Sequence, residues 1–192
     1  MIVMGKLISD VTLVLLALVC ISSCNRERVV RDNIVRLTSR PVTLPCNSMR
    51  LIACENMIDT IPKQFYWVVY SDSVDCSTCR LTNLLQWVDF IHKVKDSADS
   101  VGFRFIFSPS KRDMGAFMCT AGTLKLSSQI YLDSSNVFAR QNPHVPDDVL
   151  YHTFLLDGDG NVLLVGDPVR NTEINKMFWE LVESSRLENT QG

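Results

Sequence analysis

Two cysteines, Cys76 and Cys79, lie where the sequence changes from one pattern to another. The aromatic and β-branched run 65–70 before them predicts a strand buried on both faces. After them, apolar residues recur at steps of three and four, which predicts an amphipathic helix. These residues are Leu81, Leu84, Leu85, Val88 and Ile91. We therefore expect both cysteines in the first turn of a helix that follows a buried strand.

A cysteine at this place is chemically activated. The first N–H groups of a helix have no partner within the helix, and the peptide dipoles give that end a partial positive charge. Both effects favour the thiolate of Cys76, which is the form that attacks a disulfide. Cys79 lies one turn further along on the same face, where it can attack a mixed disulfide on Cys76. The spacing predicts thiol–disulfide exchange.

The strand, the Cys-Ser-Thr-Cys sequence and the helix resemble the thioredoxin-like superfamily, and more closely its membrane-tethered, extracytoplasmic bacterial thiol–disulfide proteins. Residues 151–166 look like the closing β-hairpin of the family, and residues 172–182 look like its final helix. The resemblance implies an α/β fold, with a mixed central sheet flanked by helices on both faces. It implies activity without a metal or organic cofactor, with protein or small-molecule thiols and disulfides as partners.

The sequence departs from the family pattern at two neighbours of the cysteines. Asp75 stands where many relatives carry an aromatic residue, and its negative charge disfavours the Cys76 thiolate. His152 stands where the family places a cis-proline. A cis bond before a non-proline residue costs about 3–4 kcal/mol, so we expect this bond to be trans. If His152 faces Cys76 it could stabilise the thiolate or accept its proton, and otherwise it fills the loop.

Other interpretations of the cysteine pair are a structural disulfide, a metal site and a binding protein that kept the fold without the chemistry. A structural disulfide is disfavoured because so short a loop restrains the unfolded chain little. In a metal chaperone, His152 would join Cys76 and Cys79 as a third ligand. A non-catalytic binding lipoprotein is the main alternative, since His152 changes the surface on which the family holds its partners.

The N-terminus predicts export and lipid attachment. Lys6 precedes an apolar run, 11–19, that is too short to span a membrane as a helix. The sequence Ile-Ser-Ser-Cys ending at Cys24 resembles the bacterial lipobox, which implies cleavage before Cys24, lipid on its sulfur and anchoring in the cell envelope. Asn25 replaces the aspartate associated with inner-membrane retention and favours the outer membrane. We expect a signal peptide at 1–23, a lipidated tether at 24–39 and a thioredoxin-like domain at 40–192.

Composition and the remaining patterns fit one globular domain. A chain of 192 residues, 46% hydrophobic, can bury one good core, and a net charge of −2 gives no electrostatic basis for binding nucleic acid. Strands at 101–107 and 129–132 that alternate with helices predict parallel pairing. A short edge strand is expected at 42–44, and a short helix around 33–37.

Three further cysteines belong to the predicted domain. Cys46 and Cys54 could form a local disulfide, a second redox pair or two buried thiols. Cys119 is expected to pack inside the protein rather than to react. Export favours an oxidising surrounding, in which an odd number of cysteines leaves at least one without an intramolecular partner.

The acidic loop 157–161 superficially suggests a calcium site. An EF-hand loop needs glycine at its sixth position and glutamate at its twelfth, and those positions hold Val162 and Pro168. The loop is better interpreted as a tight turn between two strands, in which glycine supplies the positive φ that the turn needs.

Overall fold

The computed structural model describes residues 26–52, 61–74, 77–123 and 128–190. Its strands are β1 (Arg50–Leu51), β2 (Phe65–Ser71), β3 (Val101–Phe107), β4 (Gln129–Leu132), β5 (Thr153–Asp157) and β6 (Val162–Val165). Its α-helices are α2 (Ser77–Asn83), α3 (Val88–Ser97), α4 (Met114–Thr123), α5 (Val137–Gln141) and α6 (Thr172–Thr190). Short 3₁₀ turns are η1 (Cys46–Ser48), η2 (Leu84–Trp87) and η3 (Val149–Tyr151).

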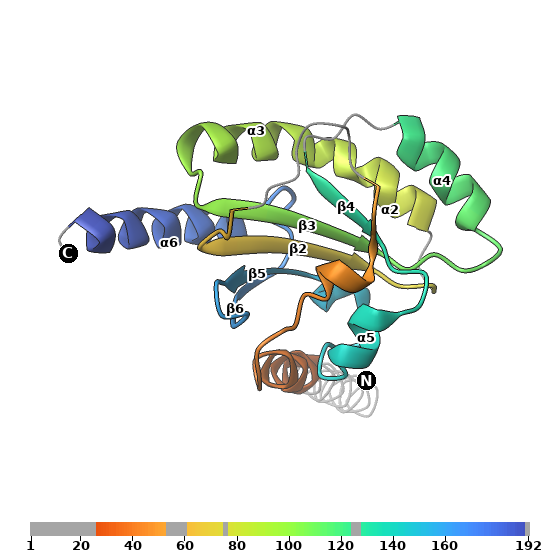
Figure 1. Ribbon diagram of the computed structural model, residues 1–192. Helices are drawn as coiled ribbons and strands as arrows, with labels where there is room; N and C mark the ends of the chain where they lie inside the picture. The colour runs from red at the N-terminus through yellow and green to blue at the C-terminus, as the bar shows by residue number, and fades with distance from the viewer. Residues whose placement is uncertain (1–25, 53–60, 75–76, 124–127, 191–192) are drawn as a thin grey trace, which may run out of the picture. The chain divides into compact units, whose positions relative to one another are not determined.

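The strands of these ranges form one mixed sheet in the order β1-β4-β3-β2-β5-β6 (Figure 1). β3 runs parallel to β2 and β4, as the alternation of strands and helices predicts. β5 pairs antiparallel with both β2 and β6, which confirms the predicted closing hairpin. The α/β class and the mixed sheet are therefore confirmed.

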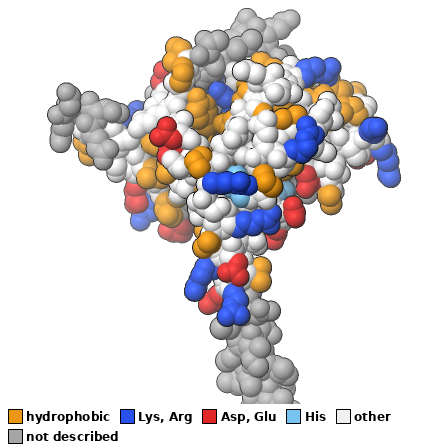
Figure 2. All heavy atoms as spheres, turned by 60° about the horizontal axis from the view of Figure 1, so that its bottom comes forward, with side chains coloured by type: hydrophobic (Ala, Val, Ile, Leu, Met, Phe, Trp, Pro, Cys, Tyr) orange, Lys and Arg blue, Asp and Glu red, His pale blue; other side chains and the backbone are white. Residues whose placement is uncertain are grey.

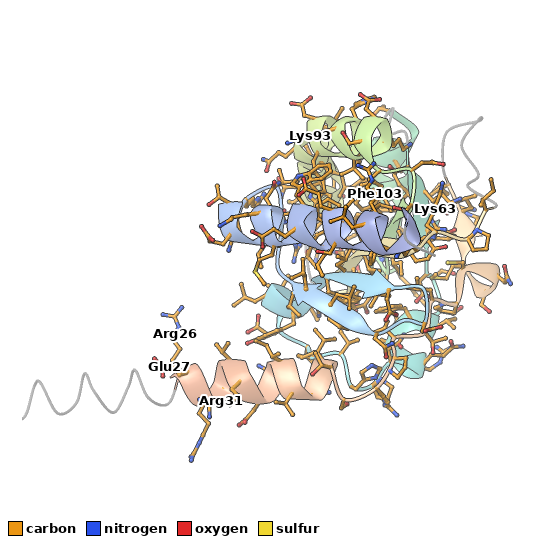
Figure 3. The ribbon with its side chains drawn as sticks, turned by 90° about the vertical axis from the view of Figure 1, so that its left-hand side faces the viewer. Arg26, Glu27, Arg31, Lys63, Lys93 and Phe103 are labelled. Carbon is orange, nitrogen blue, oxygen red and sulfur yellow. The ribbon has the colours of Figure 1, made fainter. Side chains whose placement is uncertain are left out.

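Helices cover both faces of the sheet, as predicted. On the first face, α2, α3, α4 and α6 enclose an aromatic core. Figure 3 shows Phe103 of β3 between α3 and α6, and the ammonium of Lys93 on α3 lies 5.0 Å from the centre of the Trp179 ring on α6. On the second face, the short helix α5 and the loops beside it cover a smaller core. The two faces therefore differ in what covers them, with four helices on the first and one short helix and loops on the second among the described residues.

Strand β2 lies at the centre of the structure because its residues suit burial on both faces. Trp67 is fully buried on the first face, with its ring centre 6.1 Å from that of Trp87 and 5.6 Å from that of Phe178. Val68 and Tyr70 point into the core of the second face. Parallel pairing with β3 and antiparallel pairing with β5 complete its hydrogen bonds. The predicted strand at 65–70 is confirmed.

The helix predicted after the cysteines is interrupted by the 3₁₀ turn η2. A 3₁₀ turn has three residues per turn instead of 3.6, so it rotates the residues that follow it around the helix axis. Leu84 and Trp87 become buried, while Leu85, expected on the apolar side, is 52% exposed. The indole of Trp87 thus takes the place in the core that the sequence pattern assigns to Leu85.

The segment before β1 is not the predicted strand at 42–44. The N–H of Val42 donates to Gly160 O (2.8 Å), and Thr43 is bound by the side chain of Asn142 through its N–H (2.7 Å) and its carbonyl (2.8 Å). These bonds go to a turn and to a side chain, so no ladder forms. The edge strand is instead β1, which pairs antiparallel with β4.

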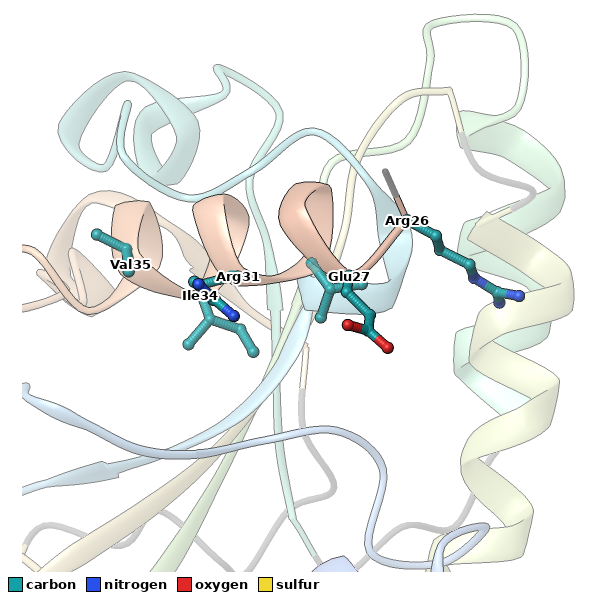
Figure 4. Close-up of a pocket in the computed structure, with 6 residues that line it drawn as sticks. Arg26, Glu27, Arg31, Ile34 and Val35 are labelled. Atoms are coloured by element: carbon teal, nitrogen blue, oxygen red, sulfur yellow. The ribbon is translucent and has the colours of Figure 1, made fainter. Parts of the chain in front are cut away.

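The chain divides into two compact units, Met1–Arg36 and Leu37–Gly192. The described part of the first unit is helical from Arg26 onward, so this helix is longer than the one expected around 33–37. Glu27, Arg31 and Ile34 follow one another at helical steps and line part of a hollow in this unit (Figure 4). The expected cleavage and lipidation site at Cys24 lies outside the described residues.

No helix within the described ranges combines the length and the apolar character that crossing a membrane requires.

Asp157 closes the turn between β5 and β6. One carboxylate oxygen accepts hydrogen bonds from the N–H groups of Asp159 (2.9 Å) and Asn161 (2.8 Å), and the other accepts from the side-chain amide of Asn161 (2.9 Å). Partial burial disfavours the charged form, but the hydrogen bonds from Asn161 and Asp159 outweigh it and hold the pKa of Asp157 below its usual value. The tight turn expected in place of a calcium loop is confirmed.

We predict that Asp157→Ala lowers the free energy of unfolding by about 1–2 kcal/mol at pH 7, because three donors lose a charged acceptor. Since the folded-state pKa is depressed, this stabilisation is complete above the unfolded-state value of about 3.9 and is lost as pH falls through the folded-state pKa. Urea denaturation across pH should show the difference from wild type closing in acid. Asp159→Ala, which removes the neighbouring carboxylate, is the matched control, and a pH-independent difference would contradict the assignment.

Candidate active site

Strand β2 ends at the edge of the sheet where the cysteine sequence begins. The carbonyl of Ser71 accepts a hydrogen bond from the N–H of Ser108 (2.8 Å), which ties the end of β2 to the residue that follows β3. Asp72 then caps the turn that leaves the sheet, accepting from a backbone N–H two residues on (3.0 Å). Asp75 and Cys76 lie outside the described residues. The carboxyl end of β2 is thus tied to the end of its parallel neighbour β3.

Cys79 lies within α2, and its side chain is exposed. It is disulfide-bonded, whereas Cys46 and Cys119, the other cysteines of the described ranges, are free thiols. The partner of Cys79 therefore lies outside these ranges. Cys119 is exposed, which corrects the expectation that it packs inside, because α4 turns Phe117 and Ala121 toward the core instead.

His152 stands immediately before β5, beside the end of β2. Its carbonyl accepts a hydrogen bond from the N–H of Tyr70 (2.8 Å), and its ring centre lies 4.9 Å from that of Tyr70. Its Nε2 is 2.9 Å from the carbonyl oxygen of Pro146. The side chain is 1% exposed, and Nδ1 has no hydrogen-bond partner among the described residues. The ring therefore fills the space between β2 and the loop before β5.

The backbone at His152 explains why proline is absent here. The N–H of His152 donates to Val149 O (3.2 Å) and so closes the 3₁₀ turn η3. Proline has no N–H to donate, so it could not close this turn. No peptide bond in the described ranges is cis, which confirms the expected trans bond before His152.

The loop that precedes η3 is held by side chains rather than by a strand. Asn142 forms paired hydrogen bonds with the backbone of Thr43 and a further one to Phe138 O (2.9 Å). Arg40 donates through Nε to Nδ1 of His144 (2.9 Å). The segment after residue 39 is thus fastened across the second face and fixes the loop against which His152 packs.

The similarity of this chain to known proteins lies in its three-dimensional structure. No protein-family model and no curated protein sequence matches the chain. Among solved structures, an uncharacterized thioredoxin-like protein from Porphyromonas gingivalis superposes with a TM-score of 0.50 at 17% sequence identity, covering 74% of this chain and 94% of that one. The chain has a thioredoxin-like fold. This confirms the thioredoxin-like fold that the resemblance implies.

Two further solved structures are similar at lower scores. A thioredoxin-like protein from Bacteroides caccae has a TM-score of 0.43 at 11% identity, covering 63% of this chain and 42% of that one. A candidate thiol:disulfide interchange protein from Chlorobium tepidum has a TM-score of 0.42 at 18% identity, covering 64% and 80% of the two chains. At these identities the likeness concerns the thioredoxin-like fold alone.

The thioredoxin-like domain has a pocket of about 370 Å³ on the second face, at the carboxyl end of β2. Its lining includes Tyr70, Asp72, Asn142, Asp147 and His152. Burial, followed by the charges of Asp72 and other nearby carboxylates, raises the pKa of Tyr70 to about 12. Figure 2 looks onto this face and shows side chains of both charges among hydrophobic ones. Of the lining residues, sequence reasoning identified only His152.

On the first face, beside the same end of β2, two arginines line a second cavity. Arg80 of α2 and Arg170 of the loop before α6 line a small cavity of about 30 Å³, together with Asp167 and Thr153. The guanidinium of Arg170 also donates to the side chain of Gln86 (3.2 and 3.3 Å). Nothing in the spacing of these residues pointed to the site, because only the fold brings their loops together.

Within the described ranges, no group of three His, Cys, Asp or Glu residues gathers as a metal site.

We predict that His152→Phe lowers the free energy of unfolding by about 1–3 kcal/mol, because the carbonyl of Pro146 stays buried without its donor. His152→Pro should cost more, since it also removes the N–H bond to Val149 and the ring contact with Tyr70. Chemical denaturation of the full-length chain measures both. His92→Phe on the exposed side of α3 is the matched control. Equal stability of His152→Pro and wild type would contradict the role given to this residue.

Proposed function

We propose that this thioredoxin-like protein is a thiol–disulfide oxidoreductase that acts through Cys76 and Cys79. The observation that supports it most directly is that Cys79 is disulfide-bonded in the helix that follows the central strand, while Cys46 and Cys119 are free. Cys76 is the cysteine nearest to Cys79 in the chain and is the partner that the proposal assigns to it.

The reaction moves two electrons and exchanges sulfur partners. In the reduced protein, the Cys76 thiolate attacks a substrate disulfide, forms a mixed disulfide and expels one substrate thiolate, which takes up a proton. The Cys79 thiolate then attacks the sulfur of Cys76 and releases the second substrate thiol. The substrate is reduced, the Cys76–Cys79 disulfide is formed, and an external thiol must reduce it again. In the oxidising direction the same steps run in reverse.

The position of the pair in the fold supports this chemistry. Cys76 follows a strand whose end is fixed by β3 and β5. Cys79 belongs to α2, whose Leu81 is buried in the aromatic core, as is Leu84 of the turn η2 that follows. Such a helix holds its first turn in a constant place relative to the sheet. In open α/β sheets, ligands bind beyond the carboxyl ends of the strands, where the pair falls.

Replacement of each cysteine should separate the two roles. Cys76→Ser should abolish reduction of insulin disulfides by the full-length protein, because the attacking thiolate is gone. Cys79→Ser should instead accumulate a mixed disulfide on Cys76 that mass spectrometry detects after acid quenching. Cys119→Ser, which removes an exposed free thiol elsewhere, is the matched control and should keep full activity. Full exchange activity in Cys76→Ser would overturn the proposal.

A redox titration with thiol alkylation gives the direction of electron flow. A Cys76–Cys79 potential between about −270 and −120 mV falls in the range of catalytic pairs, with reductants toward the lower end and oxidants toward the upper end. A potential below about −300 mV is typical of a structural disulfide and would contradict an exchange role.

We also propose that the protein lies in the cell envelope, anchored by lipid on Cys24. The outer membrane is its favoured site. The basis is the lipobox-like sequence that ends at Cys24 and the asparagine that follows it. We predict that Cys24→Ser prevents incorporation of labelled palmitate and releases the mature protein from the membrane fraction, because attached acyl chains provide stable anchoring. Cys20→Ser, inside the expected signal peptide, is the control. Labelling that persists in Cys24→Ser would refute lipidation at this residue.

A second candidate function is a binding protein that kept the fold without exchange chemistry. His152 favours it, because this histidine and its hydrogen bond to Pro146 build a loop unlike the one that the family uses to hold its partners. This alternative predicts neither insulin reduction by wild type nor a trapped intermediate with Cys79→Ser.

A further inference from the structure

The pocket on the second face is not used by the exchange steps described above. It opens at the carboxyl end of β2 and encloses about 370 Å³ between Tyr70, the first residues of the cysteine loop and the loop before η3. Its apolar wall includes Phe138 of α5, whose ring centre lies 4.7 Å from that of Tyr70. The apolar wall of the pocket is therefore well packed, and the pocket lies beside the segment that leads to Cys76.

The charged residues that line this pocket are two aspartates. Asp72 and Asp147 line it, and none of its lining residues is a lysine or an arginine. Asp72, Asp133 and Asp147 all contribute, after burial, to the raised pKa of Tyr70 at the pocket wall. Asp72 and Asp147 thus place two carboxylates at the wall of the pocket. A cation entering the pocket would be attracted by them.

His152 lines the pocket and is held by a hydrogen bond to the loop before η3. The oxygen of Pro146 can only accept a hydrogen bond, so Nε2 of His152 donates to it across 2.9 Å. In the neutral ring, Nδ1 then carries a lone pair and accepts. This nitrogen is buried and has no partner among the described residues. Because less than 1 Å² of this nitrogen is exposed, it lies behind the pocket surface, and the carboxylates of Asp72 and Asp147 supply the attraction for a cation.

We propose that this pocket is a subsite for a cationic side chain, a lysine ammonium or an arginine guanidinium, of a protein whose disulfide is exchanged. This inference rests on the proposed function. Ser73 lines the pocket and precedes Cys76 by three residues, so their Cα atoms are at most about 11 Å apart, since an extended chain spans about 3.6 Å per residue. A substrate cysteine at Cys76 therefore has its own neighbouring side chains within reach of the pocket.

The test uses cystine peptides that differ at one position near the cysteine. Peptides with lysine or arginine there are compared with the uncharged analogues norleucine and citrulline, using the full-length protein. We expect second-order rate constants about three- to fivefold higher for the cationic peptides, as for a partly exposed ion pair. Asp147→Asn should remove most of this advantage, and added salt should reduce it. Asp159→Asn makes the same charge change at the distant hairpin turn and should leave the advantage intact.

Equal rate constants for lysine and norleucine peptides, or an unchanged ratio in Asp147→Asn, would overturn the subsite while leaving the proposed function in place. If no peptide reacts at all, the proposed function fails, and a direct binding measurement then tests the cation subsite. Titration with Nα-acetyl-arginine methylamide should shift the NMR signals of Tyr70, Ala139 and Asp147, and the citrulline analogue should not. An absence of arginine-specific shifts would overturn the subsite by itself.

Discussion

The pairing of β2 with β3 on one side and β5 on the other is the constraint on which the rest of the structure depends. It fixes the point at which β2 ends, because Ser71 is bonded to Ser108 and Tyr70 is bonded to His152. The aromatic cluster around Trp67 prevents β2 from sliding along its neighbours, since a shift by one residue would turn its side chains to the wrong faces. The start of the cysteine loop, the position of His152 and the pocket beside it all follow from this end.

The two faces of the sheet reach stability by different means. The first face is closed by helices that bury large aromatic rings, so hydrophobic packing holds α2 in place. On the second face, the described residues of the domain provide the short helix α5 and several loops, and these loops need other partners for their backbone groups. Asn142 supplies them for Thr43, and His152 does so for Pro146. Polar side chains leave gaps that helix packing would fill, and this explains why the larger pocket beside the end of β2 lies on the second face.

Much of the fold could be predicted from the sequence because its signals are local. The apolar run at 65–70 and the turn at 157–161 each specify their own structure. The 3₁₀ turn that buries Trp87 in place of Leu85 could not be predicted, since it arises from fitting an indole against β2 and β3. Nor could the pocket, because Asp72 and Asp147 are far apart in the chain and only the sheet brings them together. Of that site, only His152 was visible in advance, as a departure from a family pattern.

That departure has a physical explanation in the turn before β5. The backbone carbonyl of residue 152 can accept the N–H of Tyr70 whatever side chain this residue carries. The pairing of β2 with β5 therefore does not require proline here. The turn η3, by contrast, requires an N–H at this residue, and the loop beside it requires a donor for Pro146. Histidine meets both requirements, the first through its backbone N–H and the second through Nε2. A histidine at residue 152 is therefore compatible with the strand pairing that fixes the end of β2, and it gives the loop beside that end two hydrogen bonds that proline could not donate.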